Sequence, residues 1–359
     1  MNLRKTHLAA AVGAALLAGG TAVQAQNLQV QLYGQVNRAL MFADDGHRSK
    51  TFFADGESSG TRFGFQGTSQ ITPGLRAGAR IEVEYQSNSS DSVSFESPTD
   101  NPGLAERWFD VWVEGGWGRI NLGQGSGAAD DASTIDLSGT NLPNGVCVCD
   151  WGGKINWRTS GGGLVGTTLG STHNNLDFES RYDRVMYTTP VFGGFRAQVG
   201  TGQKSTAGEV NEASLWWSGK VAGDLQAAIG WSDEKIATPG TDSNETIGGS
   251  VSWLHTSGFN VTFAYTESTV GAASPAREGS HMWGKVGYKF GQHAFSASYG
   301  IMEDQAAQGD EGDAIGFGYT WTPIRWAEFY VGLHQYTLDR TGVDVEDIQV
   351  ATVGTRIRF

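Results

Sequence analysis

The chain has no long hydrophobic run after its N-terminal region, and its mean hydropathy is −0.30. The apolar stretch at residues 8–18 is shorter than the roughly 20 residues that a membrane-spanning helix needs. The sequence therefore excludes membrane-spanning helices in the rest of the chain.

Positive charge is also scarce. The chain has 25 Lys and Arg against 38 Asp and Glu, which gives a formal net charge of −13. An acidic chain of this kind is a poor partner for the phosphate backbone of a nucleic acid. We therefore expect no nucleic-acid partner.

Common catalytic motifs are missing. There is no His-Glu-x-x-His or Gly-x-Ser-x-Gly motif, and residues 200–205 lack the spacing of a phosphate-binding loop. The seven histidines are scattered. We expect no enzymatic activity. A hydrolase whose catalytic residues come from separate strands remains an alternative, and a lipase or protease assay in detergent would detect it.

Only two cysteines are present, Cys147 and Cys149. A Cys-x-Cys pair has too few ligands for a structural zinc site, so we expect no metal there. In an exported protein the pair is a candidate disulfide, because the compartment is oxidising. The single intervening residue would close a small and strained ring, so both states stay open.

The N-terminus has the organisation of a signal peptide. A basic head that includes Arg4 and Lys5 precedes the apolar residues 8–18, and the small-residue sequence Val23-Gln24-Ala25 follows. This pattern predicts a cleaved signal at residues 1–25 and a mature chain of residues 26–359. Cleavage would remove two positive charges and leave a net charge of −15.

Short segments with strict alternation dominate the remaining chain. In residues 259–266, Phe, Val, Phe and Tyr alternate with Asn, Thr, Ala and Thr, which is typical of β-strands with two different faces. A soluble sandwich would also alternate. Small polar residues on the second face, together with Trp near strand ends at positions 231, 253, 321 and 326, favour a barrel in a membrane.

Counting these segments predicts sixteen strands. They are expected near residues 28–41, 61–71, 76–87, 106–114, 118–124, 182–189, 195–202, 210–219, 224–233, 246–256, 259–268, 281–290, 293–303, 313–322, 327–338 and 347–359. Short and long connections alternate, as in outer-membrane barrels. We expect an all-β fold, a 16-stranded antiparallel transmembrane β-barrel that forms one domain with a water-filled interior.

One connection, at about residues 125–181, is far longer than the others. Such a long loop needs a reason. We interpret it as a constriction loop folded into the pore, and its acidic residues Asp130, Asp131 and Asp136 are candidates for the narrowest point.

Several segments of the predicted wall carry recognisable short motifs. They are Leu32-Tyr33-Gly34, residues 61–67, Gly115-Gly116-Trp117-Gly118, residues 187–195 and the last strand, which ends in Phe359. In this order and spacing they resemble the trimeric general porins of Gram-negative outer membranes. The resemblance implies a homotrimer in the outer membrane, surrounded by its lipids and lipopolysaccharide, through which small hydrophilic solutes and ions diffuse. Phe359 and Ile357 resemble the family's assembly signal.

Strand alternation also predicts which charged residues line the pore. A lipid-facing arginine near the membrane midplane costs about 2–4 kcal/mol, so charged residues should face inward. The predicted basic wall residues are Arg62, Arg80, Arg107, Arg184 and Arg196, and the predicted acidic wall residues are Glu82 and Glu84. Arg62 and Arg107 resemble the family's basic cluster. Counting from Arg107 turns Asp110 outward, which fits only a bulge or a covered strand.

Opposite charges on facing walls would bias the passage of ions without trapping them. The alternative is a solute-specific outer-membrane channel with a saturable binding site in the long loop, formed by Trp151, Trp157 and His173.

Acidic residues cluster in connections expected to face outward. The clusters lie at Asp44-Asp45, Asp310 to Asp313 and Asp344 to Asp347. Ca²⁺ could bridge such carboxylates to lipopolysaccharide, and simple solubility is the alternative reason for them. We expect no other cofactor.

Overall fold

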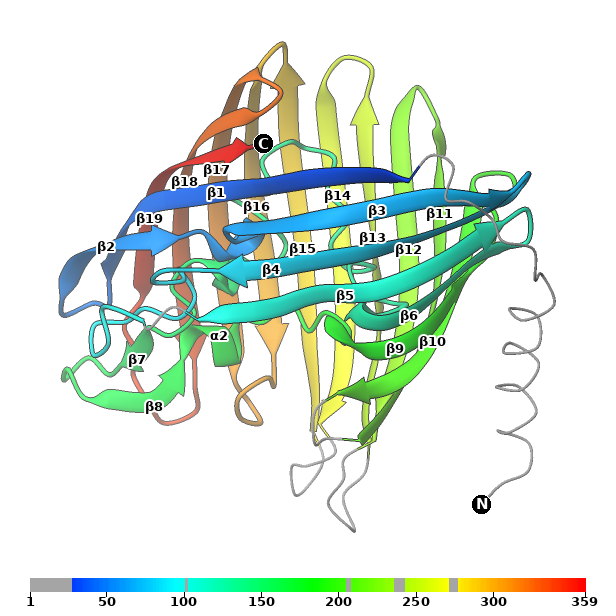
Figure 1. Cartoon of the computed structure of the whole chain (residues 1–359). Helices are drawn as coiled ribbons and strands as arrows, with labels where there is room; N and C mark the ends of the chain where they lie inside the picture. The colour runs from blue at the N-terminus through cyan, green and yellow to red at the C-terminus, as the bar shows by residue number, and fades with distance from the viewer. Residues whose placement is uncertain (1–27, 101–102, 205–207, 236–242, 271–276) are drawn as a thin grey trace.

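The computed structural model describes residues 28–100, 103–204, 208–235, 243–270 and 277–359. The predicted signal peptide, residues 1–25, lies outside the described residues. The described chain forms a closed antiparallel β-barrel (Figure 1). No helix among these residues has the length and hydrophobicity needed to cross a membrane.

Sixteen strands form the wall, and each overlaps one of the predicted strands. They are β1 (Gln29–Asp44), β3 (Arg62–Thr72), β4 (Leu75–Tyr85), β5 (Leu104–Gly115), β6 (Gly118–Ser126), β9 (Arg181–Thr188), β10 (Phe195–Lys204), β11 (Gly208–Lys220), β12 (Gly223–Glu234), β13 (Asn244–His255), β14 (Phe259–Val270), β15 (Arg277–Phe290), β16 (His293–Glu303), β17 (Glu311–Ile324), β18 (Ala327–Asp339) and β19 (Ile348–Arg358). The barrel closes where β1 pairs with β19, from Gln35 opposite Arg358 to Asp44 opposite Gln349. The predicted fold class is confirmed.

The connection expected at residues 42–60 is instead mostly strand. β1 continues to Asp44, and β2 (Ser49–Asp55) pairs with it before a 3-10 turn leads into β3. Asp45 organises the hairpin turn, because its carboxylate accepts hydrogen bonds from the backbone N–H groups of His47 and Arg48. β2 and β3 therefore occupy the position beside β1 one after the other.

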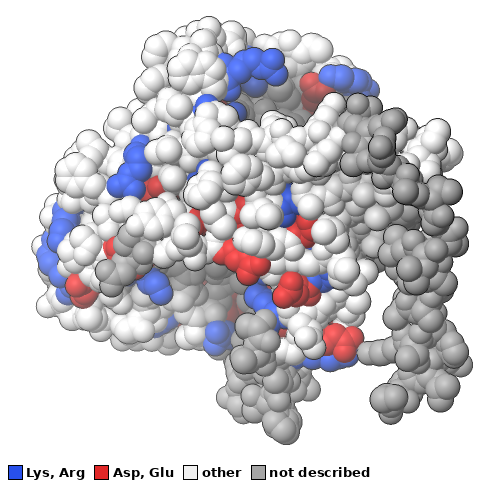
Figure 2. Space-filling model, in the orientation of Figure 1, with Lys and Arg blue, Asp and Glu red and all other residues white. Residues whose placement is uncertain are grey.

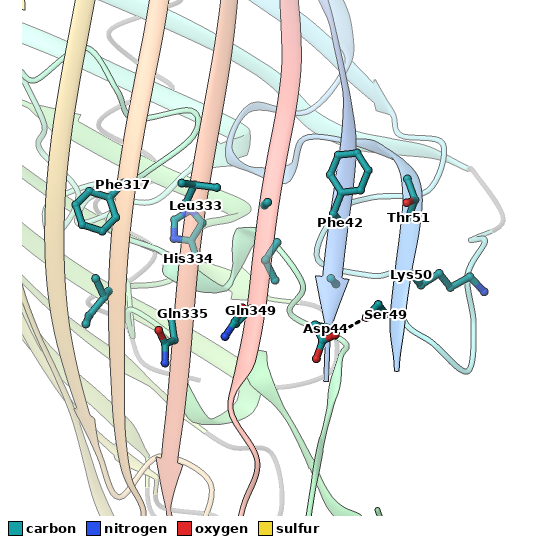
Figure 3. A pocket seen from close by; sticks show the side chains of 14 residues that line it. Phe42, Asp44, Ser49, Lys50, Thr51, Phe317, Leu333, His334, Gln335 and Gln349 are labelled. Atoms are coloured by element: carbon teal, nitrogen blue, oxygen red, sulfur yellow. Dashed lines mark hydrogen bonds between the residues drawn. The ribbon is translucent and has the colours of Figure 1, made fainter. Parts of the chain in front are cut away.

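The outer surface of the wall is apolar. On β18, for example, Leu333 is 50% exposed whereas the neighbouring His334 is 6% exposed. Figure 2 shows a largely white face on which Lys, Arg, Asp and Glu form small separate groups. Figure 3 shows Phe42, Phe317 and Leu333 on the outer wall around a hollow of about 720 Å³, with Lys50 and Gln335 among its other lining residues. This surface suits hydrocarbon.

The main hydrophobic cluster lies inside the barrel. It joins residues of the long loop to inward residues of β1, β18 and β19. Its members include Trp151, Trp157, Leu169, Met41, Tyr330, Tyr336 and Ile348. The loop contains the short hairpin β7 (Asn156–Arg158) and β8 (Leu164–Thr168), followed by one helical turn, α2 (Leu169–Thr172). The loop is thus a packed element of the interior.

The last residue completes the closure of the barrel. The backbone groups of Phe359 and Gly34 exchange two hydrogen bonds of 3.0 Å, and the Phe359 ring lies over Gly34. A Cβ atom at Gly34 would lie 2.6 Å from the Phe359 ring and 2.9 Å from the Arg62 carbonyl oxygen. Glycine is therefore required at this position of the seam.

We predict that Gly34→Ala destabilises the barrel by about 1–3 kcal/mol, because the added methyl group overpacks the seam. The measurement is the temperature at which the folded barrel loses its faster mobility in SDS gels. Gly284→Ala is the matched control, since it lies in β15 and a Cβ there has nothing within 4 Å. Equal behaviour of the two variants would contradict the prediction.

Candidate functional site

Residues 128–148 of the long loop follow the inner face of the wall. The Ser214 hydroxyl of β11 donates to the Ala128 carbonyl, and the Ile135 N–H donates to the Ser250 hydroxyl of β13. Further along, Asn144 Nδ2 donates to Ser296 Oγ of β16 at 3.0 Å. The series ends at β18, where His334 donates to the Pro143 carbonyl and the Tyr336 hydroxyl to the Val148 carbonyl.

A buried ion pair holds the middle of the loop. Lys285 Nζ of β15 lies 2.7 Å from Asp136 Oδ2, and both side chains are 0% exposed. The same ammonium donates to the Asn144 carbonyl. Asp136 was expected to face the basic wall across the pore. That expectation is wrong, because Lys285 neutralises Asp136 on the side of the wall that the loop covers.

The other two predicted loop acids lie at the foot of the loop. Carboxylate oxygens of Asp130, Asp131 and Asp177 lie within 4.8 Å of one another. Asp131 is exposed, whereas Asp130 is only 8% exposed. Burial raises the pKa of Asp130 well above its ordinary value, and the charges of Asp131 and Asp177 raise it further. Burial, together with the charge of Asp131, raises the pKa of Asp177 to about 6.

Charged residues of β3, β4 and β5 form a connected group, which we name the wall cluster: Arg62, Arg80, Glu82, Glu84 and Arg107. Glu82 is 1% exposed and lies at its centre. Its carboxylate is 2.5 Å from Arg80, 2.9 Å from Arg107 and 3.7 Å from Arg62. Arg107 also pairs with Glu84. Three arginines and two glutamates give the wall cluster a net charge of one positive unit. Of the three arginines that contact Glu82, Arg62 has the longest contact.

Arg107 reaches the wall cluster from a bulge. In the pairing of β4 with β5, Glu82 lies opposite Trp108 and Val83 lies opposite Glu106, so Arg107 is the extra residue. The bulge changes which residues face inward. Val111 is 52% exposed and Asp110 is 4% exposed, so Asp110 faces inward, and the bulge that the inward placement of Arg107 required is present.

Arg184 faces inward but is not free to meet ions. Its guanidinium donates to the carbonyl oxygens of Gly123 and Ser126 and to the carboxylate of Asp110, and its side chain is 0% exposed. The expectation that Arg184 is an open wall charge is therefore wrong. Arg184 fixes the start of the loop.

Arg196 lies near the beginning of β10, with its guanidinium carbon 5.0 Å from the centre of the Trp216 ring. Its Nε has no hydrogen-bond partner in the described part of the chain. It does not belong to the wall cluster, whose members lie on β3, β4 and β5.

The three residues proposed for a saturable binding site are buried packing residues. Trp151 is 2% exposed, and Trp157 and His173 are 0% exposed. The Trp157 indole donates to Thr172, and the Trp157 and His173 rings lie 5.4 Å apart. A solute cannot stack on these rings, so this version of the solute-specific channel is wrong.

The two cysteines are free thiols, so the candidate disulfide is not formed in this structure.

Two acids of the outer clusters are paired with arginines: Asp45 with Arg48 and Arg158, and Asp310 with Arg340. These arginines reduce the negative charge that was expected to attract Ca²⁺ there.

Sequence reasoning missed Lys285, Asp177 and Asp110. The inward position of Lys285 follows from the exposure of its neighbours Met282 and Val286, and strand alternation could have revealed it. Its pairing with Asp136 spans 149 positions and leaves no local signal.

The geometry defines a class: a transmembrane β-barrel whose charged interior contains a folded loop. The family model described as "Gram-negative porin" matches residues 9–341. The chain belongs to this family and is a multi-pass barrel of the outer membrane. The family resemblance inferred from the sequence is confirmed.

Relatives with curated descriptions agree. The chain is 28% identical over 250 residues to outer membrane porin protein 32 of Delftia acidovorans, covering 67% of this chain and 64% of the relative. It is 25% identical over 215 residues to an outer membrane porin protein of Bordetella pertussis, covering 55% of this chain and 48% of that relative. The matches thus span less than two thirds of either relative.

Solved structures share the fold. The anion-selective porin from Comamonas acidovorans has a TM-score of 0.67 at 18% identity, with 93% of this chain and 100% of that chain covered. OmpF of Salmonella typhi, in complex with daunomycin, has a TM-score of 0.64 at 14% identity, with 92% and 98% covered. The trimer form of OmpT of Vibrio cholerae has a TM-score of 0.60 at 15% identity, with 93% and 100% covered.

We predict that Lys285→Met releases the loop from β15, because it leaves the Asp136 carboxylate buried without a partner. Breaking one side of a buried pair costs about 3–5 kcal/mol. Amide hydrogen exchange of residues 132–144 should accelerate. The double variant Lys285→Met, Asp136→Leu should restore slow exchange, because it leaves no buried charge. Unchanged exchange in the single variant would show that the pair does not hold the loop.

Proposed function

We propose that the barrel is a water-filled channel for passive diffusion of small hydrophilic solutes and ions, and that residues 127–180 narrow it. The observation that carries the proposal is the position of the loop. It binds the inner faces of β13, β15 and β16, whereas the wall cluster lies on β3, β4 and β5. β4 and β14 are half-way around the strand order from each other, so solutes would pass between loop and cluster.

The charges at this narrow point are fewer than the sequence suggests. Of the predicted loop acids, Asp131 is the exposed one, and Arg62 is the least compensated arginine of the wall cluster. Two unit charges 4 Å apart interact by about 4 kcal/mol near a protein surface and by about 1 kcal/mol in water. Charges that face an aqueous channel interact with an energy nearer the lower value, so the loop would bias the passage of ions and not bind them.

A homotrimer is the proposed assembly. Apolar side chains on the outer faces of β1 and β3, including Leu32, Phe63 and Phe65, are 43–57% exposed and could be covered by a second subunit. The related OmpT has been described in a trimer form. Native mass measurement in mild detergent tests this assembly, and a monomer alone would contradict it.

Lipids and lipopolysaccharide are the proposed surroundings of the wall. The hollow lined by Phe42, Phe317 and Leu333, with Lys50 also among its lining residues (Figure 3), suits an acyl chain beside a phosphate group.

A Ca²⁺ bridge between the acidic connections and lipopolysaccharide would have to use acids without an arginine partner among the described residues, such as Asp344 and Glu346 in the last long connection. If chelation leaves oligomer melting unchanged in lipopolysaccharide-containing samples, the calcium bridge is absent.

We predict opposite shifts in ion selectivity from two single substitutions. Asp131→Asn should move the reversal potential in a salt gradient toward anions, and Arg62→Gln should move it toward cations, while conductance changes less. The physical reason is that ions meet both charges where the water layer is thinnest. Asp344→Asn and Arg325→Gln are matched controls in other connections. If neither test variant differs from its control, the loop is not the constriction.

Selectivity should also depend on pH. As the pH falls through about 6, Asp177 takes up a proton because its pKa is raised to that value, and the foot of the loop becomes less negative. The reversal potential should move toward anions. Glu57 also titrates in this range, since burial raises its pKa to about 7. Asp177→Asn should therefore remove part of the pH response, and an unaltered response would contradict the assignment.

A further inference from the structure

A second cluster of potential ligands lies in the long loop, apart from the residues proposed to select ions. The Sγ atoms of Cys147 and Cys149 and a carboxylate oxygen of Asp150 all lie within 4.8 Å of one another. Zinc binds sulfur at about 2.3 Å and carboxylate oxygen at about 2.0–2.2 Å. Three ligand atoms at these separations can therefore reach one ion.

The local backbone creates this convergence. The Asp150 N–H donates to the Cys147 carbonyl at 3.3 Å, which closes a tight turn over the 3-10 segment Val148–Asp150. Two outside contacts hold the turn in place. The Tyr336 hydroxyl of β18 donates to the Val148 carbonyl at 2.8 Å, and the Ser90 hydroxyl donates to the Asp150 carbonyl at 2.5 Å. The ligands are thus presented by a fixed turn.

The surroundings of the turn favour a cation. The side chains with the strongest electrostatic effect on the Asp150 carboxylate are Cys147, Glu57 and Asp91, all of them acidic. Cys149 is 8% exposed, whereas Cys147 and Asp150 are partly exposed, so an ion could reach the turn. A partly buried acidic group surrounded by other acids is stabilised when a positive ion replaces its missing partner.

We propose that Cys147, Cys149 and Asp150 form a binding site for one thiophilic divalent cation of the Zn²⁺ class. Two thiolates select a softer metal than Ca²⁺ or Mg²⁺, which prefer oxygen ligands. Three protein ligands leave the fourth position of a tetrahedral ion to water. The bound ion would brace the turn that attaches the loop to β18. The inference stands whether or not the loop selects ions.

The first test asks whether the thiols exist in the exported protein. The full chain is extracted from outer membranes in mild detergent without reductant, denatured, and its free thiols are counted. Two thiols per chain are expected. A disulfide between Cys147 and Cys149 would overturn the proposal, because the ligands would be consumed.

The second test measures binding with Cd²⁺, whose bonds to thiolates give an ultraviolet charge-transfer absorption. One equivalent should bind, and Zn²⁺ should displace it. The absorption should disappear in Cys147→Ser, Cys149→Ser. Affinity should fall at least about tenfold in Asp150→Asn, since even the loss of an outer-shell partner costs 10–100-fold. Asp339→Asn, at the exposed end of β18, is the matched control and should bind like the unaltered chain.

Two outcomes of the binding test would overturn the site: no thiolate absorption in the unaltered chain, or unchanged affinity in Asp150→Asn. Circular dichroism of the β-barrel checks that each variant is folded. A further measurement uses only the unaltered chain, so its result does not depend on whether a variant folds. Zn²⁺ should slow maleimide labelling of the thiols in the unaltered chain, whereas Ca²⁺ should not. Equal labelling rates with and without Zn²⁺ would also refute the site.

Discussion

The structure depends on one constraint: every backbone N–H and C=O group that faces hydrocarbon must be hydrogen-bonded within the protein. Sixteen strands meet this requirement only because β1 pairs with β19 and leaves no free edge. The C-terminal Phe359 takes part in that closure through its two backbone bonds to Gly34. Irregular backbone can then occur only at the rims or in the interior, and the long loop satisfies several of its backbone polar groups on the inner wall.

The inner face of the wall is built to receive that loop. The small polar residues that alternate with lipid-facing side chains are its hydrogen-bond partners, including Ser214, Ser250 and Ser296. Lys285 supplies a charge where the loop carries Asp136, and the tyrosine and valine residues of β18 and β19 enclose Trp151. The polar face that marked the chain as a barrel in the sequence is therefore also the surface that positions the loop.

The lipid-facing and inward-facing sides of the strands explain which structural features the sequence could predict. Strand positions follow from a period of two that the membrane enforces along every strand, so all sixteen appeared in the sequence. The bulge at Arg107 changes the alternation by one residue without any change in composition, so strand alternation alone could not distinguish it from a covered strand. β2 was missed because it is short and a charged turn separates it from β1, although Phe52 and Phe53 already alternate between 2% and 68% exposure. The pair of Asp136 with Lys285 depends on the folded path of the loop, which no local pattern encodes.

The pairing of charges inside the barrel limits what the net charge of the chain predicts about ion passage. The chain is strongly acidic, at −13, yet Asp136 is neutralised by Lys285, and Glu82 and Glu84 are neutralised by three arginines. Charges paired in the interior contribute little to the field that a passing ion meets, whereas a single under-compensated guanidinium at a narrow point contributes much, because screening is weakest there. Arg62 is held by contacts of 3.3–3.7 Å, longer than those of Arg80 or Arg107. Under the proposed function, the local imbalance around Glu82, and not the sum over the chain, would govern the sign of charge that the wall presents to a passing ion.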